Sequence, residues 1–349
     1  MIKVLVVDDS ALIRALLGKL IAADPALMLV GAAPDAFVAR EMVIRLQPDV
    51  ITLDIEMPKV DGLTFLTRLM QARPTPVIMI STLTSAGADV TLRALELGAV
   101  DFIAKPTLDV SRGIDAYQEL ITTKIKMAAQ ARLVKPKAMN LGSVAMRSNN
   151  LMSAETILAI GASTGGTEAI KYLLMQFPVA MPAIVITQHM PPGFTKTFAT
   201  RLDSLCQVRV KEAEQGERLL AGWAYIAPGD QHMEVIRSGA EYRVRLHQEE
   251  RVSGHRPSVD VLFRSLAQSA GINTVALILT GMGRDGAQGM LRLSQQGGYT
   301  FAQDEASCVV FGMPKEAIRL NAVSEVLGLD ELADAVLKKL TALCPARPL

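Results

Sequence analysis

The sequence predicts two α/β domains in succession, each built on a doubly wound sheet. Short apolar runs alternate with amphipathic segments of helical period, which is typical of parallel sheets flanked by helices. The 349 residues exceed what one hydrophobic core usually supports, and a polar stretch near the middle interrupts the alternation. We therefore expect a first domain over residues 1–120, a helix end and flexible linker over 121–153, and a second, larger domain over 154–349.

The first domain is predicted to contain a five-stranded parallel sheet. Its short apolar runs are typical of buried strands and lie at residues 4–7, 27–30, 50–53, 77–80 and 100–104. Segments between them, such as residues 12–20, carry apolar side chains at helical spacing. A further helix over residues 117–133 is expected to complete this doubly wound domain.

The second domain is predicted to be a larger doubly wound α/β domain, with a mostly parallel sheet and an antiparallel edge. Helical patterns and strand-like runs alternate at both ends of the region, whereas its middle is richer in strands. The expected strands lie at residues 157–160, 183–187, 208–210, 224–227, 242–246 and 275–280. The expected helices lie at residues 167–177, 194–205, 259–270, 286–296 and 331–343.

Composition argues against several classes of protein. Lys and Arg total 36 against 35 Asp and Glu, and no terminal helix-turn-helix pattern with a basic helix is present, so nucleic acid is not an expected partner. Cys206, Cys308 and Cys344 lack the spacing of a zinc site or a disulfide framework, so we expect reduced thiols. No apolar stretch approaches about 20 residues, so we expect a cytoplasmic protein without membrane insertion.

In the first domain, charged or hydroxyl side chains stand at the ends of four of the five predicted strands. Asp8 and Asp9 end the first predicted strand, Asp54 ends the third, Ser81 the fourth and Lys105 the fifth. The carboxyl ends of parallel strands share one edge of the sheet, where three carboxylates repel one another unless a cation such as Mg²⁺ or a lysine neutralises them. The alternative is that the acidic pair caps the next helix.

Residues 3–106 resemble a response-regulator receiver domain. The resemblance is carried by the acidic pair, by Asp54 followed by Met57 and Pro58, by Ser81, and by Lys105 before Pro106. It implies that Asp54 accepts a phosphoryl group, and that charge added there moves the donors facing it. The implied Mg²⁺ ligands are Asp8, Asp9, Asp54 and the backbone carbonyl of Glu56, and the implied switch residues are Ser81, Phe102 and Lys105.

A glycine-rich segment opens the second domain. Residues 157–166 combine a short apolar run with Gly-Ala-Ser-Thr-Gly-Gly, so Ser163 is expected between a strand and a helix. There its hydroxyl can project from the sheet edge, close to the positive end of the following helix. These conditions suit a serine nucleophile. The alternative is a turn that binds phosphate or only joins two elements.

Two more strand ends of the second domain carry chemically useful side chains. His189 follows the run at 183–187, and Asp285 follows the run at 275–280. Taken alone, His189 would suit a surface or core position and Asp285 a helix N-cap. Together with Ser163 they form the set in which histidine takes the serine proton and aspartate orients the imidazole. Glycines on both sides of Met282 would let its backbone N–H face an oxyanion.

The other histidines lack this placement. His232, His247 and His255 are interpreted as structural or rim residues. His255 precedes Arg-Pro-Ser at an expected helix start. The alternative for His255 is therefore that its segment lines the active-site cleft.

The second domain resembles the catalytic domain of the chemotaxis response-regulator protein-glutamate methylesterases. The matching stretches are residues 161–166, 188–194, 227–232, 255–262 and 280–286, and the receiver-like domain in front completes the family's order. The resemblance implies a triad of Ser163, His189 and Asp285 with no cofactor for the ester hydrolysis. It also implies receptor glutamate methyl esters as substrates, methanol as a product, glutamine deamidation in some members, and a histidine kinase as phosphoryl donor.

Two alternatives to this enzyme stay open at the level of sequence. One is a response regulator whose second half binds a protein partner or DNA without chemistry, although the balanced charge disfavours DNA. The other is an amidase or deamidase with the same triad, because acyl transfer to serine suits amides as well as esters. We expect a monomer whose first domain controls the activity of the second through phosphorylation.

Overall fold

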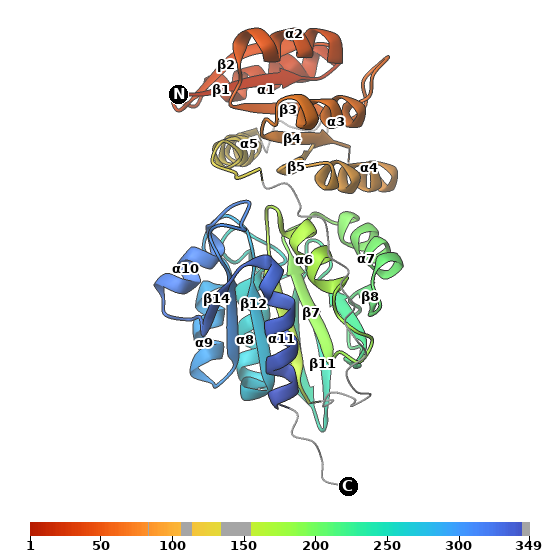
Figure 1. The fold of residues 1–349 in the computed structure, drawn as a ribbon, viewed down its shortest axis with the longest axis vertical. Helices are drawn as coiled ribbons and strands as arrows, with labels where there is room; N and C mark the ends of the chain where they lie inside the picture. Colours follow the sequence, from red (N-terminus) through yellow and green to blue (C-terminus); the bar gives the residue numbers. More distant parts are fainter. Residues whose placement is uncertain (83, 106–113, 134–154, 344–349) are drawn as a thin grey trace. The chain divides into compact units, whose positions relative to one another are not determined.

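The computed structural model describes residues 1–82, 84–105, 114–133 and 155–343. The chain divides into two compact units, Met1–Lys135 and Pro136–Leu349, each with its own sheet (Figure 1). Most of the expected linker, together with Cys344, lies outside the described residues.

The first unit contains the predicted five-stranded parallel sheet, in the order β2-β1-β3-β4-β5. Its strands are β1 (Ile2–Val7), β2 (Leu27–Ala33), β3 (Val50–Asp54), β4 (Val77–Ser81) and β5 (Asp101–Ala104). Its helices are α1 (Ala11–Ala22), α2 (Ala36–Leu46), α3 (Gly62–Ala72), α4 (Ser85–Glu96) and α5 (Ile114–Ala128). The strand order reverses between β1 and β3, which is where sheets of this type bind ligands.

Side-chain caps fix where the first four helices begin. The N-cap residues Ser10, Asp35, Asp61 and Thr84 each accept a hydrogen bond from a backbone N–H of the first turn. Because Ser10 is the cap of α1, Asp8 and Asp9 do not have that role. The alternative in which the acidic pair caps this helix is therefore wrong, and both carboxylates are left at the sheet edge.

The second unit contains a seven-stranded parallel sheet in the order β14-β13-β12-β6-β7-β9-β8. Its strands are β6 (Ile157–Ala162), β7 (Ala183–Gln188), β8 (Arg209–Glu212), β9 (Trp223–Ile226), β12 (Thr274–Ile278), β13 (Tyr299–Gln303) and β14 (Glu325–Leu327). All residues of the three central strands β12, β6 and β7 are buried, as their apolar runs predict.

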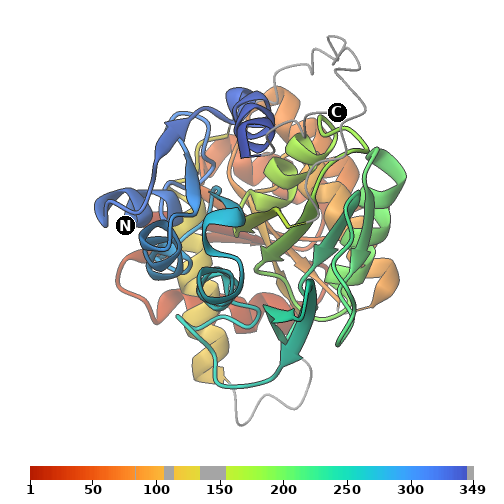
Figure 2. The ribbon, with the colours of Figure 1, turned by 90° about the horizontal axis from the view of Figure 1, so that it is seen from below.

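Helices cover both faces of this sheet. α6 (Gly166–Leu174) and α11 (Leu329–Leu343) contact each other on one face, and α8 (Val259–Ser269) and α9 (Ala287–Gln295) contact each other on the opposite face (Figures 1 and 2). The remaining helices of the unit are α7 (Phe194–Leu205), α10 (Met313–Arg319) and the short 3-10 turn at Gly271–Asn273. Each sheet face is thus shielded from water, as a parallel sheet requires.

Antiparallel pairing is present as predicted, but it forms a separate two-stranded sheet and not an edge of the parallel sheet. β10 (His232–Ser238) and β11 (Glu241–His247) pair with each other, and β10 packs on α8, where Val235 N–H donates to Ser265 Oγ at 2.9 Å. β11 also bridges the segment around Arg218, for example through Leu219 N–H to the Tyr242 carbonyl at 2.9 Å. The sequence prediction missed β10, β13, β14 and α10. Helix α5 also begins and ends earlier than expected. No helix among the described residues is both long and apolar enough to cross a bilayer.

A buried histidine in the β10–β11 sheet predicts a loss of stability in mild acid. His232 is fully buried, and its Nε2–H donates to the carbonyl of Glu250 at 3.0 Å, so Nδ1 is the bare nitrogen and has no hydrogen-bond partner among the described residues. Burial lowers the pKa of His232, although the Glu250 carbonyl opposes this. The unfolded chain therefore binds more protons, and stability should be complete above about pH 6.5 and fall below it.

His232→Gln should remove this component of the pH dependence. Urea unfolding of the wild type and the variant between pH 5 and 8 checks the prediction, with His247→Gln as the matched control on the partner strand. Parallel stability curves for the wild type and His232→Gln would contradict it.

Candidate functional site

Three carboxylates meet at the carboxyl edge of the first sheet. Asp8 and Asp9 follow β1 and Asp54 ends β3, and each offers an oxygen within 4.8 Å of the others. Asp8 and Asp54 are 1% exposed, whereas Asp9 faces solvent. This donor set suits a hard divalent cation such as Mg²⁺, which prefers one or two carboxylates and keeps several waters.

One lysine partly neutralises this cluster. Lys105 Nζ lies 2.8 Å from Asp54 Oδ2 and 3.4 Å from Asp8 Oδ2, but neither oxygen has a well-aligned hydrogen bond within the described residues. Burial raises the pKa of Asp54 to about 6, in opposition to Lys105. Burial likewise raises the pKa of Asp8. A single ammonium does not balance three carboxylates, so the residues present fit a bound cation.

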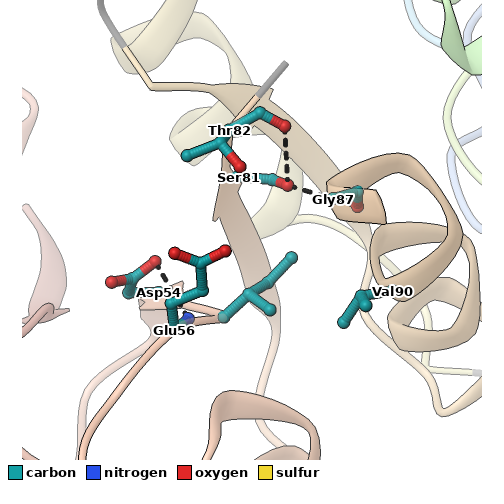
Figure 3. A pocket seen from close by; sticks show the side chains of 7 residues that line it. Asp54, Glu56, Ser81, Thr82, Gly87 and Val90 are labelled. Carbon is teal, nitrogen blue, oxygen red and sulfur yellow. Dashed lines mark hydrogen bonds between the residues drawn. The ribbon is translucent and has the colours of Figure 1, made fainter. Parts of the chain in front are cut away.

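A pocket opens beside Asp54. It is lined by Asp54, Ile55, Glu56, Ser81, Thr82, Gly87 and Val90 (Figure 3). The Ser81 hydroxyl lies in this lining and contacts the carbonyls of Thr82 and Gly87 at 3.3 and 3.4 Å, while it accepts a bond from Thr91 Oγ1 at 2.8 Å. Lys105 N–H donates to the Ser81 carbonyl at 2.7 Å. Ser81, Lys105 and Asp54 are therefore brought to one edge, as their strand-end positions predict.

Phe102 lies in β5, two residues before the strand end. Its side chain is buried, and Lys124 Nζ from α5 lies 5.6 Å from its ring centroid. The same ammonium pairs with Asp101 Oδ1 at 2.8 Å and donates to the Phe102 carbonyl at 2.9 Å. These contacts hold the ring inward in this structure.

In the second unit, sheet register places Ser163 beside His189. Ala162 at the end of β6 is paired with Gln188 at the end of β7, and His189 N–H donates to the Ala162 carbonyl at 3.2 Å. On the other side of β6, Ser163 N–H donates to the carbonyl of Thr280 at 3.0 Å. Ser163 thus follows the central strand of the sheet and is only partly exposed.

The loop around Ser163 depends on glycine and on one buried amide. Gly165 has φ 76°, and a side chain there would also meet Val309. Gln188 Nε2 donates to the Ser163 carbonyl at 2.9 Å and lies 3.3 Å from the His189 carbonyl. A single side chain thereby ties the backbone of the serine turn to the backbone of the histidine turn.

His189 and Asp285 form a direct pair. His189 Nε2 lies 2.8 Å from Asp285 Oδ2, and both side chains are buried. Because a carboxylate only accepts, Nε2 carries the proton and Nδ1 is the basic nitrogen of the neutral ring. Nδ1 has no hydrogen-bond partner among the described residues, so it is not bonded to Ser163 in this structure.

The N-terminus of α8 holds the Asp285 carboxylate. Asp285 Oδ1 accepts from Ser258 Oγ at 2.7 Å and from Asp260 N–H at 3.2 Å, and Oδ2 accepts from Val259 N–H at 2.7 Å. Burial alone would raise the pKa of Asp285, but His189, Ser258 and Val259 outweigh it and lower the pKa. The alternative of Asp285 as the cap of α9 is not supported, because that cap is Gly286, without a side-chain bond.

The peptide between Gly281 and Met282 has a fixed orientation. The Gly281 carbonyl accepts from Gly312 N–H at 3.1 Å and from Met313 N–H at 2.8 Å. In a trans peptide, the N–H of Met282 then points in the opposite direction. Gly281 also lies against the serine, because a Cβ there would be 2.7 Å from the Cβ of Ser163. This geometry is compatible with Met282 as a backbone donor at the site.

Sequence reasoning gave too little weight to the segment before α8. The ring of His255 stacks on the ring of His189, with centroids 3.7 Å apart and planes at 10°. His255 therefore lies in the wall of the site, which is the alternative that its place before Arg-Pro-Ser suggested. Ser258, which binds Asp285, was recognised only as part of the helix start. His232 and His247 pair in the β10–β11 sheet.

Comparisons with known proteins find relatives of both units. A family model described as CheB methylesterase matches residues 158–336, and one described as response regulator receiver domain matches residues 4–118. The chain is 59% identical to protein-glutamate methylesterase/protein-glutamine glutaminase 2 of Pseudomonas aeruginosa, over 97% of each chain. It is 54% identical to protein-glutamate methylesterase/protein-glutamine glutaminase of Salmonella typhimurium, over 98% of this chain and 97% of that protein.

A solved structure shows the same likeness for the second unit. The crystal structure of the Thermotoga maritima CheB methylesterase catalytic domain matches with a TM-score of 0.52 and 38% identity, over 53% of this chain and 98% of that one. Full-length relatives and both family models thus agree with the two sheets and with their order. The chain therefore belongs to the CheB methylesterase family, with a response regulator receiver domain in front of the methylesterase domain.

Proposed function

We propose that this protein is a phosphorylation-regulated serine hydrolase that removes methyl groups from glutamate methyl esters on chemoreceptor cytoplasmic domains. The observation that carries the proposal is the buried His189–Asp285 pair directly beside Ser163 at one sheet edge. The names of the full-length relatives supply the substrate class, and they also support deamidation of receptor glutamines. Methanol or ammonia is the expected product, and the signalling role is adaptation in chemotaxis.

The geometry divides the chemistry among three side chains. Ser163 Oγ attacks the ester carbonyl carbon while His189 Nδ1 takes the hydroxyl proton, because Nε2 is already bonded to Asp285. Asp285 stabilises the imidazolium, and the Met282 N–H faces the oxyanion. When the tetrahedral intermediate collapses, methanol leaves with the proton from Nδ1. Water activated by His189 then cleaves the acyl-serine bond to give glutamate and free Ser163.

The receiver unit is proposed to be the regulatory input. Asp54 is the proposed phosphoryl acceptor, with a histidine kinase of the chemotaxis pathway as donor. Asp8, Asp9, Asp54 and the backbone carbonyl of Glu56 would hold Mg²⁺, and the three carboxylates meet at one point as this requires. The ion would neutralise charge on the transferring phosphoryl group. Ser81 and Lys105 lie where they could meet the phosphorylated side chain, and Phe102 is the proposed aromatic switch.

The remaining parts of the proposal follow from the sequence and the substrate. The methylated helices would be cytoplasmic, so the enzyme is proposed to act in the cytoplasm, as a monomer. We propose no nucleic-acid partner, no direct membrane insertion and no cofactor for ester hydrolysis. The division into a receiver domain, a linker and a catalytic domain at about residues 120 and 154 is part of the same proposal.

Phosphorylation should raise turnover through Asp54. With Mg²⁺ and a small phosphoryl donor such as acetyl phosphate, methanol release from methylated receptor membranes should rise about 5-fold or more. Asp54→Asn should keep the basal rate and lose the increase, because the acceptor carboxylate is gone. The assay measures methanol with and without the donor.

Asp61→Asn is a matched control for this substitution. Asp61 caps α3 through Thr64 N–H, and asparagine caps equally well, so its response to the donor should match that of the wild type. A donor response that survives in Asp54→Asn would place the acceptor elsewhere.

A further inference from the structure

We propose that His255 is a positioning residue, whose ring clamps the ring of His189 so that its basic nitrogen stays aimed at Ser163. The inference rests on the proposed function, since it assigns His189 as the base. It concerns a side chain outside the Ser163, His189 and Asp285 set, and it follows from the stacking of the two rings at 3.7 Å and 10°.

The known bonds of His189 restrain the rotation of its ring at only one ring atom. The backbone is held by His189 N–H to the Ala162 carbonyl at 3.2 Å, and Nε2 is held by Asp285 at 2.8 Å. The ring turns about the Cβ–Cγ bond, and this rotation moves both ring nitrogens. The single bond at Nε2 opposes a large rotation, but it tolerates a small one, which already displaces Nδ1 relative to Ser163. A flat neighbour on the ring face blocks that rotation.

His255 can serve as such a neighbour because its own backbone is fixed. Val252 and His255 exchange two backbone hydrogen bonds, at 3.1 and 2.9 Å, across a tight turn whose two central residues have positive φ. The next residue, Arg256, donates to Asp230 Oδ1 at 2.8 and 3.0 Å and to the carbonyls of Gln248 and Glu249 at 2.8 and 2.9 Å. These hydrogen bonds fix the segment that bears the His255 ring.

The same short segment also fixes the carboxylate of the pair. Three residues after His255, Ser258 and the first N–H groups of α8 bind Asp285. One continuous stretch therefore sets the ring plane of His189 through His255 and the position of its partner through the helix N-terminus. Stacking also directs the nitrogens of His255 along its own plane, parallel to the His189 ring, so His255 acts through its face and not as a second base.

Substitutions that keep or remove the aromatic face test this proposal. His255→Ala should lower kcat for methanol release by about 10- to 100-fold with KM within about 3-fold, because misplacement of a catalytic group by about 1 Å costs about 100-fold. His255→Phe should recover most of kcat, since a phenyl ring can stack in the same place. His247→Phe, a matched change in the β10–β11 sheet, should leave kcat unaltered.

Two results would overturn the clamp. One is an unchanged kcat in His255→Ala, and the other is a kcat in His255→Phe as low as in His255→Ala, which would assign the role to the nitrogens of His255. Circular dichroism and denaturant unfolding check that each variant is folded.

A readout without turnover separates the clamp from the proposed function. In ¹⁵N-histidine NMR of the full chain, His255→Ala should shift and broaden the His189 ring signals, and His255→Phe should keep them narrow. Identical His189 spectra for the wild type and His255→Ala would refute the clamp whatever the enzyme does. Absence of methanol release by the wild type, with a His189 signal that responds to His255→Ala, would refute the proposed function and leave the clamp standing.

Discussion

Ser163→Ala is expected to lower methanol release by about 10⁴-fold or more, with and without a phosphoryl donor. The methyl side chain has no oxygen to form the acyl-enzyme, so His189 has no proton to take and the two-step route is closed. The rate that remains would come from substrate binding and the backbone donor near Met282. The measurement is methanol release from methylated receptor membranes at saturating substrate.

The control for this variant has two parts. Phosphorylation of Asp54 should be intact in Ser163→Ala, because the receiver unit has its own sheet and core. Ser204→Ala is the matched serine change, since Ser204 Oγ only donates to the Arg201 carbonyl on an exposed part of α7, and it should behave as wild type. Methanol release above about a tenth of the wild-type rate in Ser163→Ala would remove Ser163 from the nucleophile role.

The rival functions give different results in the same assay. A wild type that is folded and phosphorylatable, yet releases no methanol from several receptors, should next be assayed for glutamine deamidation. Ammonia release that depends on Ser163 would identify a deamidase with the same triad. Without either product, the second unit would be an interaction module, and the buried His189–Asp285 pair would need another explanation.

The strand ends of both sheets were predictable because strong local signals mark them. The apolar runs around residues 4–7, 50–53 and 157–160 are long enough to identify buried strands, and parallel sheets align their carboxyl ends. Asp54, Lys105, Ser163 and His189 each follow such a run, so their side chains were expected at an edge. The structure places them there.

The support around Asp285 could not be predicted in the same way. His255 and Ser258 belong to an irregular segment whose path depends on tertiary bonds such as Arg256 to Asp230. Hydrophobic periodicity predicts helix α8, but it does not predict that the N-terminus of this helix points at the carboxylate of Asp285 from another loop. The edge strand β14 was missed because it has three residues with two of them exposed, which leaves little apolar pattern to detect.

Asp285→Asn should be nearly as damaging to catalysis as loss of the serine. The wild-type carboxylate accepts four hydrogen bonds and stabilises the imidazolium, and an amide cannot reproduce this. If its NH₂ replaces Oδ2, it faces Val259 N–H and His189; if it replaces Oδ1, it faces Asp260 N–H. One backbone donor loses its acceptor in either orientation, and the negative charge is lost in both. We expect kcat to fall by about 10³- to 10⁴-fold.

Stability should respond to the same change in a pH-dependent way. Because the pKa of Asp285 is lowered in the folded protein, its contribution is present above the unfolded value of about 3.9 and is lost as pH falls below it. Asp285→Asn should therefore be less stable by about 1–3 kcal/mol at pH 7, and this difference should shrink in acid. Denaturant unfolding at pH 7 and pH 3.5 measures it.

Asp203→Asn separates the loss of catalysis from the loss of stability. Asp203 also binds a backbone N–H, that of Val210 at 2.7 Å, and its pKa is also lowered: burial acts to raise it, but Arg209 and Val210 outweigh burial. Asp203 lies in α7, away from Ser163. Asp203→Asn should therefore lower stability, as Asp285→Asn does, but it should leave kcat unchanged. If Asp285→Asn retained kcat within about 10-fold of wild type, the imidazolium of His189 would need no buried charge. The division of roles within the triad would then be wrong, because general base help alone is worth about 10²- to 10⁴-fold.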